Sequence, residues 1–507
     1  MNRLHAEEKR ICAKLLLLFL LMISWVISSV QSTTTSVYRQ VGKKYAVNST
    51  MNGSIIAQIS GDSERILYYD YFHFVSYVYQ NDPVSGTMYH LSTSFNIKGI
   101  NETKNNSCNL CAALNNDGSV IVLGNTDVSF GSVGGAFIFK RNALGKYDQM
   151  QEIPFPGTNL TGEPTYFGTA IACNLDCSTL AIGAKRYKSG SVFTYRLQED
   201  TYKFMGEIRV SNIPLNASFG TSVALNADGN YLLASASSPM SGKVYGFRFN
   251  GARWIQLDEI NAPSMSIPNN SLNEFGFQLA MNHLGTIAVI GSLDSGAYVY
   301  GKSPTWQLKS AVKPNNFSAT PGDYFGSAVS INGKGTLVAV SAPGTNNRTG
   351  ESWVFAFNGV KLTQQGPAII ANDASNQSFQ GYFNSLNEGG ALLVVTSGFD
   401  DNIGAFTVYR RNNTKPVPRY CRPRKVSTFR RCTNLITRCS KFGIKMKFGL
   451  RCGRQRNGRA KIGTCQCDQY CGYPCKKACN NDPQCFWKNN VCYNAMDNTP
   501  GVPISVC

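Results

Sequence analysis

A short motif recurs through the middle of the chain and restricts the folds open to it. An asparagine that begins a turn returns every 50 to 59 residues, and each copy is followed by an apolar run and then by an aromatic stretch of period two. Repeats of this length and alternation predict four-stranded blades, which stack around an axis because one blade cannot bury both of its faces alone. The asparagines of the clear copies are Asn115, Asn174, Asn226, Asn282, Asn332 and Asn387.

A degraded first copy, Ser60-Gly-Asp-Ser63, brings the number of blades to seven. The predicted fold is all-β: a seven-bladed β-propeller over residues 33–412 and a small disulfide-rich domain after it. The turn itself explains the recurring asparagine and glycine, because both residue types tolerate positive φ. No catalytic role is needed for them.

The two ends of the repeat array are predicted to meet. The last copy lacks an outer strand, whereas the segment Ser36 to Tyr45 has strand character and no blade of its own. We expect this segment to pair with the seventh blade as its outer strand, with Val37 within strand-pairing distance of the region between Ala405 and Arg410, because such pairing removes an exposed sheet edge.

Further features recur in register over residues 45–412. A Phe-Gly pair stands seven residues before the asparagine in four copies, and buried runs end in Gly-Ala or Ser-Ala-Pro. With these features the chain resembles the FG-GAP repeat family, the propeller type of the integrin α head and of many other secreted proteins. The resemblance implies the fold, whereas FG-GAP propellers host adhesion, lectin-like recognition and accessory roles alike. The pairs are Phe167-Gly168, Phe219-Gly220, Phe275-Gly276 and Phe325-Gly326.

The turns differ from those of integrin-type blades, which carry an Asp-rich Ca²⁺ loop because a hard cation needs several oxygen ligands on one short loop. One turn here offers Asn226 with Asp228, and later turns place His283 or Lys334 at such positions. We therefore expect no metal and no other cofactor, since these turn sequences do not support calcium.

We assign no catalytic residues and expect a protein that is not an enzyme. The string Gly296 to Ser303 matches the phosphate-loop pattern, but its middle is an aromatic strand and Pro304 follows where a helix should begin. The pair Asp400-Asp401 is interpreted as a solvated loop. Packing between blades is favoured over carbohydrate stacking for three tryptophans at repeat positions, namely Trp254, Trp306 and Trp353.

The N-terminus and the sequons indicate the secretory pathway. Basic residues precede the apolar-rich run Leu15 to Val30, so residues 1–32 are predicted to be a signal peptide, with an uncleaved type II membrane anchor as the alternative. Eleven Asn-x-Ser/Thr triplets indicate a glycosylated surface. The acceptor residues are Asn48, Asn52, Asn101, Asn105, Asn159, Asn216, Asn269, Asn316, Asn347, Asn376 and Asn412.

Most cysteines lie beyond a predicted linker, residues 413–420, in a module spanning 421–507. An even number of cysteines in a short module is typical of a disulfide framework in an oxidising compartment. Within the propeller, the spacing of Cys173 and Cys177 suits a disulfide across a hairpin turn. The cysteines expected in disulfides are Cys108, Cys111, Cys173, Cys177, Cys421, Cys432, Cys439, Cys452, Cys465, Cys467, Cys471, Cys475, Cys479, Cys485, Cys492 and Cys507.

Positive charge is concentrated in the same module. Residues 413–507 carry 19 Lys+Arg against 3 Asp+Glu, whereas residues 1–412 carry 30 against 27. Such density attracts polyanions, although a purely solubilising role is the alternative. The residues expected to bind polyanions are Arg422, Arg424, Lys425, Arg430, Arg431, Arg438, Lys441, Lys445, Lys447, Arg451, Arg454, Arg456, Arg459 and Lys461.

These features together predict a secreted or cell-surface recognition or adhesion protein. The propeller would bind an extracellular protein or glycan, and the basic tail would bind acidic polysaccharide or an anionic cell surface. Nucleic acid has the right charge but belongs to another compartment. Two alternatives stand beside this hypothesis: a glycan-active enzyme with a site on the propeller axis, and a structural component of a wall or matrix.

Overall fold

A computed structural model of the chain divides into two compact units, Met1–Arg411 and Asn412–Cys507. In the first unit it describes residues 38–46, 55–71, 73–81, 89–97, 108, 110–126, 133–158, 164–214, 216–237, 242–263, 274–293, 296–315, 317–318, 320–375, 377–400 and 403–411. In the second unit it describes short strands between residues 424 and 494. Within the described residues, no helix is both long and apolar enough to cross a membrane.

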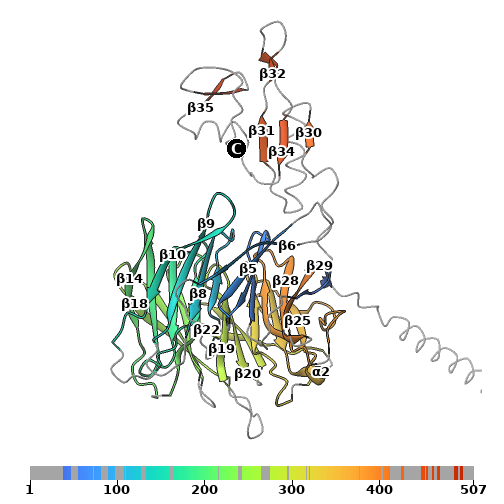
Figure 1. Cartoon of the computed structure of the whole chain (residues 1–507). Coiled ribbons are helices and arrows are strands. Elements are labelled where there is room, and N and C mark those ends of the chain that lie inside the picture. Colours follow the sequence, from blue (N-terminus) through green and yellow to red (C-terminus); the bar gives the residue numbers. More distant parts are fainter. Residues whose placement is uncertain are drawn as a thin grey trace, which may run out of the picture. The chain divides into compact units, whose positions relative to one another are not determined.

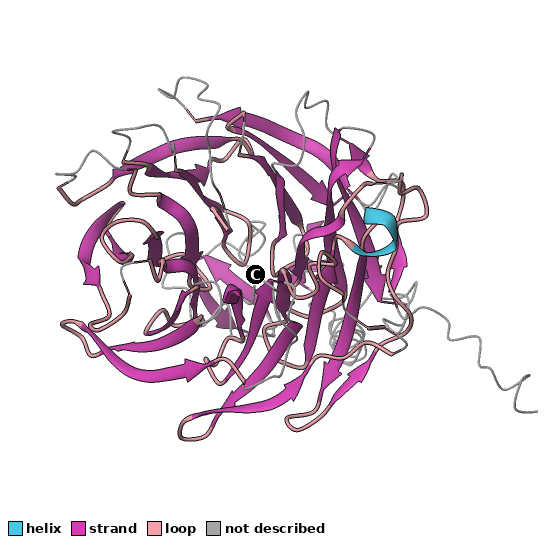
Figure 2. Ribbon diagram, turned by 90° about the horizontal axis from the view of Figure 1, so that it is seen from below, coloured by secondary structure: helices cyan, strands magenta, loops and turns pink. Residues whose placement is uncertain are grey.

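The first unit is a seven-bladed β-propeller, as predicted (Figures 1 and 2). Each blade is an antiparallel sheet, and the first strands of successive blades contact one another around the ring.

The strand bounds follow the repeat. Blade 1 comprises β3 (Ile55–Ile59), β4 (Arg65–Asp70), β5 (Val75–Asn81) and β6 (Tyr89–Asn96). Blade 2 comprises β7 (Ala112–Leu114), β8 (Val120–Asn125), β9 (Gly135–Arg141) and β10 (Tyr147–Pro154). Blade 3 comprises β11 (Phe167–Cys173), β12 (Thr179–Ala184), β13 (Ser191–Gln198) and β14 (Thr201–Ile208). Blade 4 comprises β15 (Phe219–Leu225), β16 (Tyr231–Ala236), β17 (Lys243–Phe249) and β18 (Trp254–Asn261).

The remaining blades keep this order. Blade 5 comprises β19 (Glu274–Met281), β20 (Ile287–Leu293), β21 (Gly296–Lys302) and β22 (Trp306–Ala311). Blade 6 comprises β23 (Ala328–Ile331), β24 (Leu337–Ala342), β25 (Glu351–Phe357) and β26 (Leu362–Gln364), with the short helix α2 (Thr345–Arg348) before β25. Blade 7 comprises β27 (Gln380–Leu386), β28 (Leu392–Asp400) and β29 (Ile403–Arg411), completed by β1 (Tyr38–Gln40) and β2 (Tyr45–Ala46).

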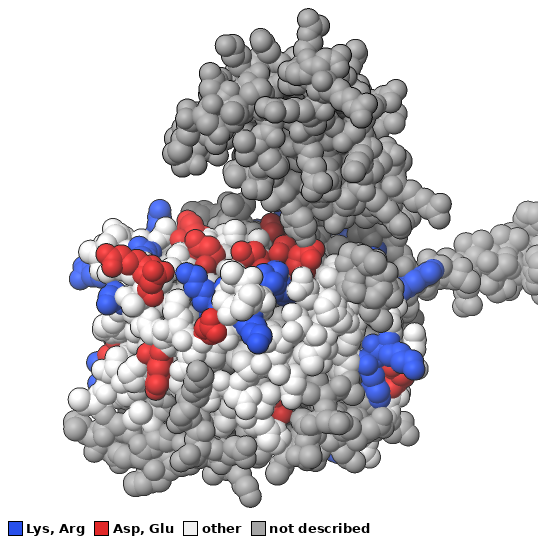
Figure 3. All heavy atoms as spheres, turned by 45° about the horizontal axis from the view of Figure 1, so that its top comes forward, with Lys and Arg blue, Asp and Glu red and all other residues white. Residues whose placement is uncertain are grey.

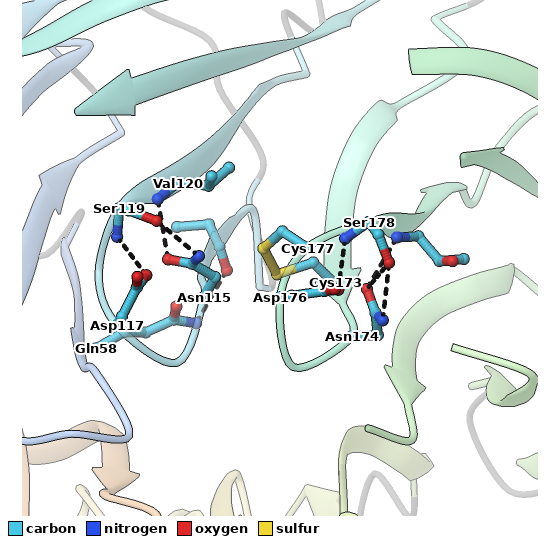
Figure 4. Close-up of a disulfide and its surroundings, with 12 residues drawn as sticks. Gln58, Asn115, Asp117, Ser119, Val120, Cys173, Asn174, Asp176, Cys177 and Ser178 are labelled. Atoms are coloured by element: carbon cyan, nitrogen blue, oxygen red, sulfur yellow. Dashed lines mark hydrogen bonds between the residues drawn. A yellow bond between two sulfur atoms is a disulfide. The ribbon is translucent and has the colours of Figure 1, made fainter. Parts of the chain in front are cut away.

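The recurring asparagine holds the turn between the first two strands of a blade (Figure 4). Asn115 Oδ1 accepts a hydrogen bond from the Val120 amide at 2.9 Å, and Asn174 Oδ1 accepts one from the Thr179 amide at 2.8 Å. The asparagines are buried, and a buried side-chain oxygen that satisfies a turn amide stabilises the hairpin. In blade 1 the Ser60 hydroxyl takes this role by accepting from the Arg65 amide at 2.9 Å.

The Phe-Gly pairs lock neighbouring blades together. Gly220 has φ +89°, and a Cβ there would lie 2.6 Å from the Ser191 carbonyl oxygen of the preceding blade. Gly326 has φ +97°, and a Cβ there would lie 2.1 Å from the Gly296 carbonyl oxygen. Only glycine permits this approach of blade backbone to blade backbone, while the preceding phenylalanine is buried.

A ring of backbone hydrogen bonds links the blades around the axis. The residue after the turn asparagine donates its amide to the carbonyl of the equivalent residue in the next blade, at 2.9 to 3.3 Å, from Asn116 to Leu175, Ala227, His283, Gly333 and Glu388 in turn. Between blades 7 and 1 the link is different: Asn387 Nδ2 donates to Ser63 Oγ at 2.7 Å. The repeat thus closes on itself with a side-chain bond.

The predicted closure by the N-terminal segment is confirmed. Strand β1 pairs antiparallel with β29, with Tyr38 opposite Arg411 and Gln40 opposite Tyr409. Strand β2 pairs with the same strand, with Tyr45 opposite Phe406. Val37 lies outside the described residues.

The break between β1 and β2 was not predicted. The Asp373 carboxylate holds it by accepting hydrogen bonds from Gln40 Nε2 at 2.9 Å and from the Lys44 amide at 3.0 Å.

The described strands of the second unit form three small sheets. One has the order β30 (Arg424–Val426), β34 (Cys465–Asp468), β31 (Lys447–Leu450). Two hairpins pair β32 (Gly453–Arg454) with β33 (Ala460–Lys461) and β35 (Cys485–Lys488) with β36 (Val491–Asn494).

Candidate functional site

A pocket of about 740 Å³ opens between blades 4 and 5. We name it the blade 4–5 pocket. Its walls come from the turns that join first to second and third to fourth strands, so it opens on the face of the propeller that carries those turns, here called the turn face. The lining residues are Arg196, Asn226, Asp228, Asn230, Tyr231, Arg248, Phe249, Gly251, Leu257, Asp258, Leu284, Gly285, Thr286, Lys302, Pro304 and Thr305.

Tyr231, Asp258 and Lys302 form the floor of this pocket, and Trp306, which does not line it, is hydrogen-bonded to them through Tyr231. Tyr231 donates its hydroxyl proton to Asp258 Oδ2 at 2.6 Å and accepts from Trp306 Nε1 at 2.8 Å. Lys302 Nζ donates to Tyr231 Oη at 2.9 Å and to Asp258 Oδ2 at 2.7 Å. The Asp258 side chain is 8% exposed and the Lys302 side chain 21% exposed, so the ion pair is largely shielded from water.

The Tyr231 hydroxyl remains a donor in this network. Burial, and then the hydrogen-bonded Asp258 carboxylate, raise the pKa of Tyr231 well above its usual range. The Lys302 ammonium also lies 4.0 Å from the centre of the Tyr231 ring. The phenol therefore stays neutral and fixes the position of both charged groups.

Blade 4 makes room for the network by departing from the repeat at two positions. Five residues after the turn asparagine, blade 4 has Tyr231, where blades 5 and 6 have Ile287 and Leu337. At the centre of the third strand it has Gly246, where a Cβ would lie 2.3 Å from Tyr231 Oη and 2.9 Å from Asp258 Oδ2. These two departures were the signal in the sequence that could have revealed the site.

Two polar groups of residues that line the pocket have hydrogen-bonding capacity left. Lys302 Nζ has three protons, of which two are used, and within the described residues Asp258 Oδ1 accepts no hydrogen bond. The floor therefore offers one donor beside one acceptor.

The rim combines positive charge with apolar surface. The Arg196 guanidinium lies over the Phe249 ring at 4.8 Å, and its Nη2 donates to Asn230 Oδ1 at 3.3 Å. Arg248 is exposed. Leu257 and Leu284 are 54% and 77% exposed and both line the pocket, which gives it an apolar wall.

A smaller cavity, about 220 Å³, lies at the axis on the same face and is lined by all seven blades. Its titratable side chains are His283 and Glu388, whose Nδ1 and Oε1 atoms are 4.0 Å apart. Figure 3 brings the turn face forward and shows acidic side chains gathered on it, with basic ones among them.

A half-buried lysine lies at the other end of the blades. Burial, and then the neighbouring Arg186, lower the pKa of Lys185 to about 8, while Glu274 opposes this shift. Lys185 follows β12, and its ammonium lies 5.2 Å from the centre of the Tyr166 ring.

The turn carboxylates bind backbone amides. Asp117 Oδ1 accepts from the Ser119 amide at 3.0 Å, and Asp228 Oδ1 accepts from the Asn230 amide at 2.9 Å. Across the described part of the chain, no three His, Cys, Asp or Glu side chains are grouped so that they could hold a metal ion.

Two predicted disulfides are present. Cys108 bonds Cys111 and Cys173 bonds Cys177, with Cα–Cα distances of 5.4 and 4.7 Å. The second clamps the turn of blade 3, where Cys177 takes φ 55° in place of the usual glycine (Figure 4). The side chains of the other twelve predicted cysteines, all in the second unit, lie outside the described residues.

Two predicted glycosylation sites can be placed: Asn216 and Asn347 are both exposed on loops or short helix. The other nine acceptor asparagines lie outside the described residues. For the predicted polyanion-binding residues, the backbones of Arg424, Lys425, Lys447, Arg454 and Lys461 lie in described strands. The side chains of these five residues lie outside the described part of the structure. The remaining nine residues lie outside it entirely.

The interpretation of the tryptophans as packing between blades is confirmed. Trp254 Nε1 donates to Thr194 Oγ1 of blade 3 at 3.1 Å, and Trp353 is buried. Trp306 of blade 5 also packs between blades, and its Nε1 donates to Tyr231 Oη of blade 4 in the floor of the blade 4–5 pocket. The string that resembles a phosphate loop forms β21, as predicted, and its Lys302 contributes to the pocket instead.

Two solved structures are similar to part of this chain at low sequence identity. No family model and no curated protein matches the sequence. The β-propeller domain of Cps50 (Swd1) from Myceliophteria thermophila is 9% identical with a TM-score of 0.48, over 72% of this chain and 99% of that one. Hydrazine synthase from Kuenenia stuttgartiensis is 9% identical with a TM-score of 0.49, over 72% of this chain and 97% of that one. The assignment of a seven-bladed propeller rests on the sheet topology of the chain itself.

Proposed function

We propose that the chain is a secreted recognition protein of the FG-GAP type, without catalytic activity, whose propeller binds a glycan or protein ligand. The blade 4–5 pocket is the observation that carries this proposal. Its floor is held by its own hydrogen bonds, so a ligand would meet groups that are already in position. Preorganisation of this kind reduces the cost of binding.

The basic tail has a second role in this proposal, adhesion to a polyanionic matrix or cell surface. The sequence of the tail has a strongly positive net charge, which the propeller lacks. Arginine binds sulfate and carboxylate groups through two parallel hydrogen bonds. The exposed sequons Asn216 and Asn347 and the disulfide of the blade 3 turn support an oxidising, glycosylating compartment.

A panel of immobilised glycans tests the function. We expect the full-length protein to be retained on acidic glycans without releasing reducing ends during prolonged incubation. Release of reducing ends under turnover would overturn the proposal of a recognition protein and favour a glycan-active enzyme. Assembly of the purified protein into insoluble material, with no retention of soluble glycan, would favour a structural component.

Retention on heparin, in the same panel, tests the contribution of the basic tail to binding. Retention there should be lost at moderate salt, because exposed charges are screened within about 8 Å at physiological ionic strength. Truncation after Asn413 should abolish it. Equal retention of the truncated propeller would show that the tail is not the adhesive part.

A further inference from the structure

We infer that the blade 4–5 pocket binds an acidic sugar unit, a pyranose ring that carries one carboxylate or sulfate group. The inference rests on the proposed function, because it names the ligand of the same site. Its volume, about 740 Å³, lies within the range of about 300 to 1,000 Å³ found for small-ligand sites.

The floor of the pocket suits sugar hydroxyls. A hydroxyl donates one hydrogen bond and accepts others, and the floor presents the third proton of Lys302 beside Asp258 Oδ1. Both groups are bound to Tyr231, which limits the rotamers that a ligand would have to order. An acceptor and a donor fixed side by side recognise vicinal hydroxyls better than they recognise an isolated carboxylate, which only accepts.

The rim suits an anion. Three basic side chains line the pocket against two acidic ones, and Lys302 and Asp258 neutralise each other. Arg196 is already oriented by Phe249, whereas the side chain of Arg248, whose backbone lies in β17, has no hydrogen bond or ion pair with any described residue. A guanidinium pairs carboxylate or sulfate in a planar, two-point manner, so Arg248 is assigned the acid group of the ligand.

The apolar wall completes the match. A pyranose has a face of C–H groups that packs on apolar and aromatic side chains, and the pocket presents Phe249, Leu257 and Leu284. A neutral sugar would use the floor and this wall but not Arg248, and an acidic peptide would use Arg248 but not the hydroxyl pair of the floor.

Monovalent probes test the inference on the full-length protein, because a single sugar unit cannot bridge several charges of the tail. The probes are methyl β-D-glucuronoside, its neutral methyl ester, glucose 6-sulfate and N-acetyl-aspartate amide, titrated by saturation-transfer NMR. We expect saturable binding of glucuronoside or sulfate, binding of the ester about tenfold weaker, and about a tenfold loss in Arg248→Ala. The matched control is Arg39→Ala, an exposed arginine on β1 of blade 7, which should leave binding unchanged.

The outcomes separate the inference from the proposed function. Which of the two acidic sugars binds identifies the acid group. Equal binding of N-acetyl-aspartate amide would overturn the sugar assignment in favour of an acidic peptide, and equal loss in both arginine variants would overturn the site. Retention of acidic polymers without any binding of the monovalent probes would overturn this inference and leave the proposed function standing, whereas absence of all retention would remove both.

Discussion

Deletion of residues 33–45 is expected to destabilise the whole propeller and to lower its melting temperature in a single cooperative transition. The segment supplies the outer strand of blade 7, and its loss would leave β29 as an exposed edge. Tyr38 carries much of this effect: its side chain is 2% exposed and its hydroxyl donates to the Gly390 carbonyl at 2.6 Å. Tyr38→Ala alone should cost about 3 to 5 kcal/mol, which lowers the melting temperature of a propeller of this size by roughly 5 °C.

Scanning calorimetry of the two variants checks this prediction. Arg39→Ala is the matched control on the same strand, where the side chain is exposed and a change within about 0.5 kcal/mol is expected. Two separated transitions after the deletion, or an unchanged melting temperature in Tyr38→Ala, would show that β1 is not needed for the cooperative stability of the propeller.

Lys302→Met is expected to be the most destabilising change in the blade 4–5 pocket. It leaves the Asp258 carboxylate, which is 8% exposed, without its cation. Removal of one partner from a fully buried ion pair costs about 3 to 5 kcal/mol, and the partial exposure of Lys302 reduces our expectation to about 2 to 4 kcal/mol. Denaturant unfolding at neutral pH measures the loss.

A second substitution and a second ion pair serve as controls. When Asp258→Asn is combined with Lys302→Met, the double variant should recover more than half of the unfolding free energy lost in Lys302→Met. The reason is that the carboxamide oxygen can still accept from Tyr231 but carries no charge. Lys243→Met removes the partner of Glu259 in an ion pair of 2.5 Å whose side chains are both 41% exposed, and it should cost no more than about 1 kcal/mol. Equal losses of unfolding free energy in Lys302→Met and Lys243→Met would contradict the claim that the ion pair of Lys302 and Asp258 is shielded from water.

The repeat made the fold predictable because its residues act locally. The turn asparagine satisfies amides four or five residues away, so its spacing marks every hairpin whatever the rest of the blade does. The sequence showed that blade 7 lacks its outer strand. It also showed that the segment before Tyr45 has strand character but belongs to no blade. Their pairing then followed from the need to cover a sheet edge.

The pocket was not predicted because its lining residues come from three blades and because blade 4 breaks the repeat at only two positions near it. Tyr231 and Gly246 are departures within blade 4, but Asp258 and Lys302 occupy strand positions where any polar residue would be unremarked. Their contact depends on how blade 5 packs against blade 4. Distances between blades do not follow from the period of one blade.

Hydrogen exchange with a bound ligand is the most direct test of the claim that the propeller recognises its ligand at the blade 4–5 pocket. The ligand is an acidic oligosaccharide retained by the full-length protein on the glycan panel. The account predicts slower exchange of backbone amides in residues 226–231, 248–251, 284–286 and 302–305 of the liganded protein, with little change in the turns of blades 1, 2 and 7. Protection confined to the axial mouth or to the region around Lys185, with none in those four segments, would contradict it.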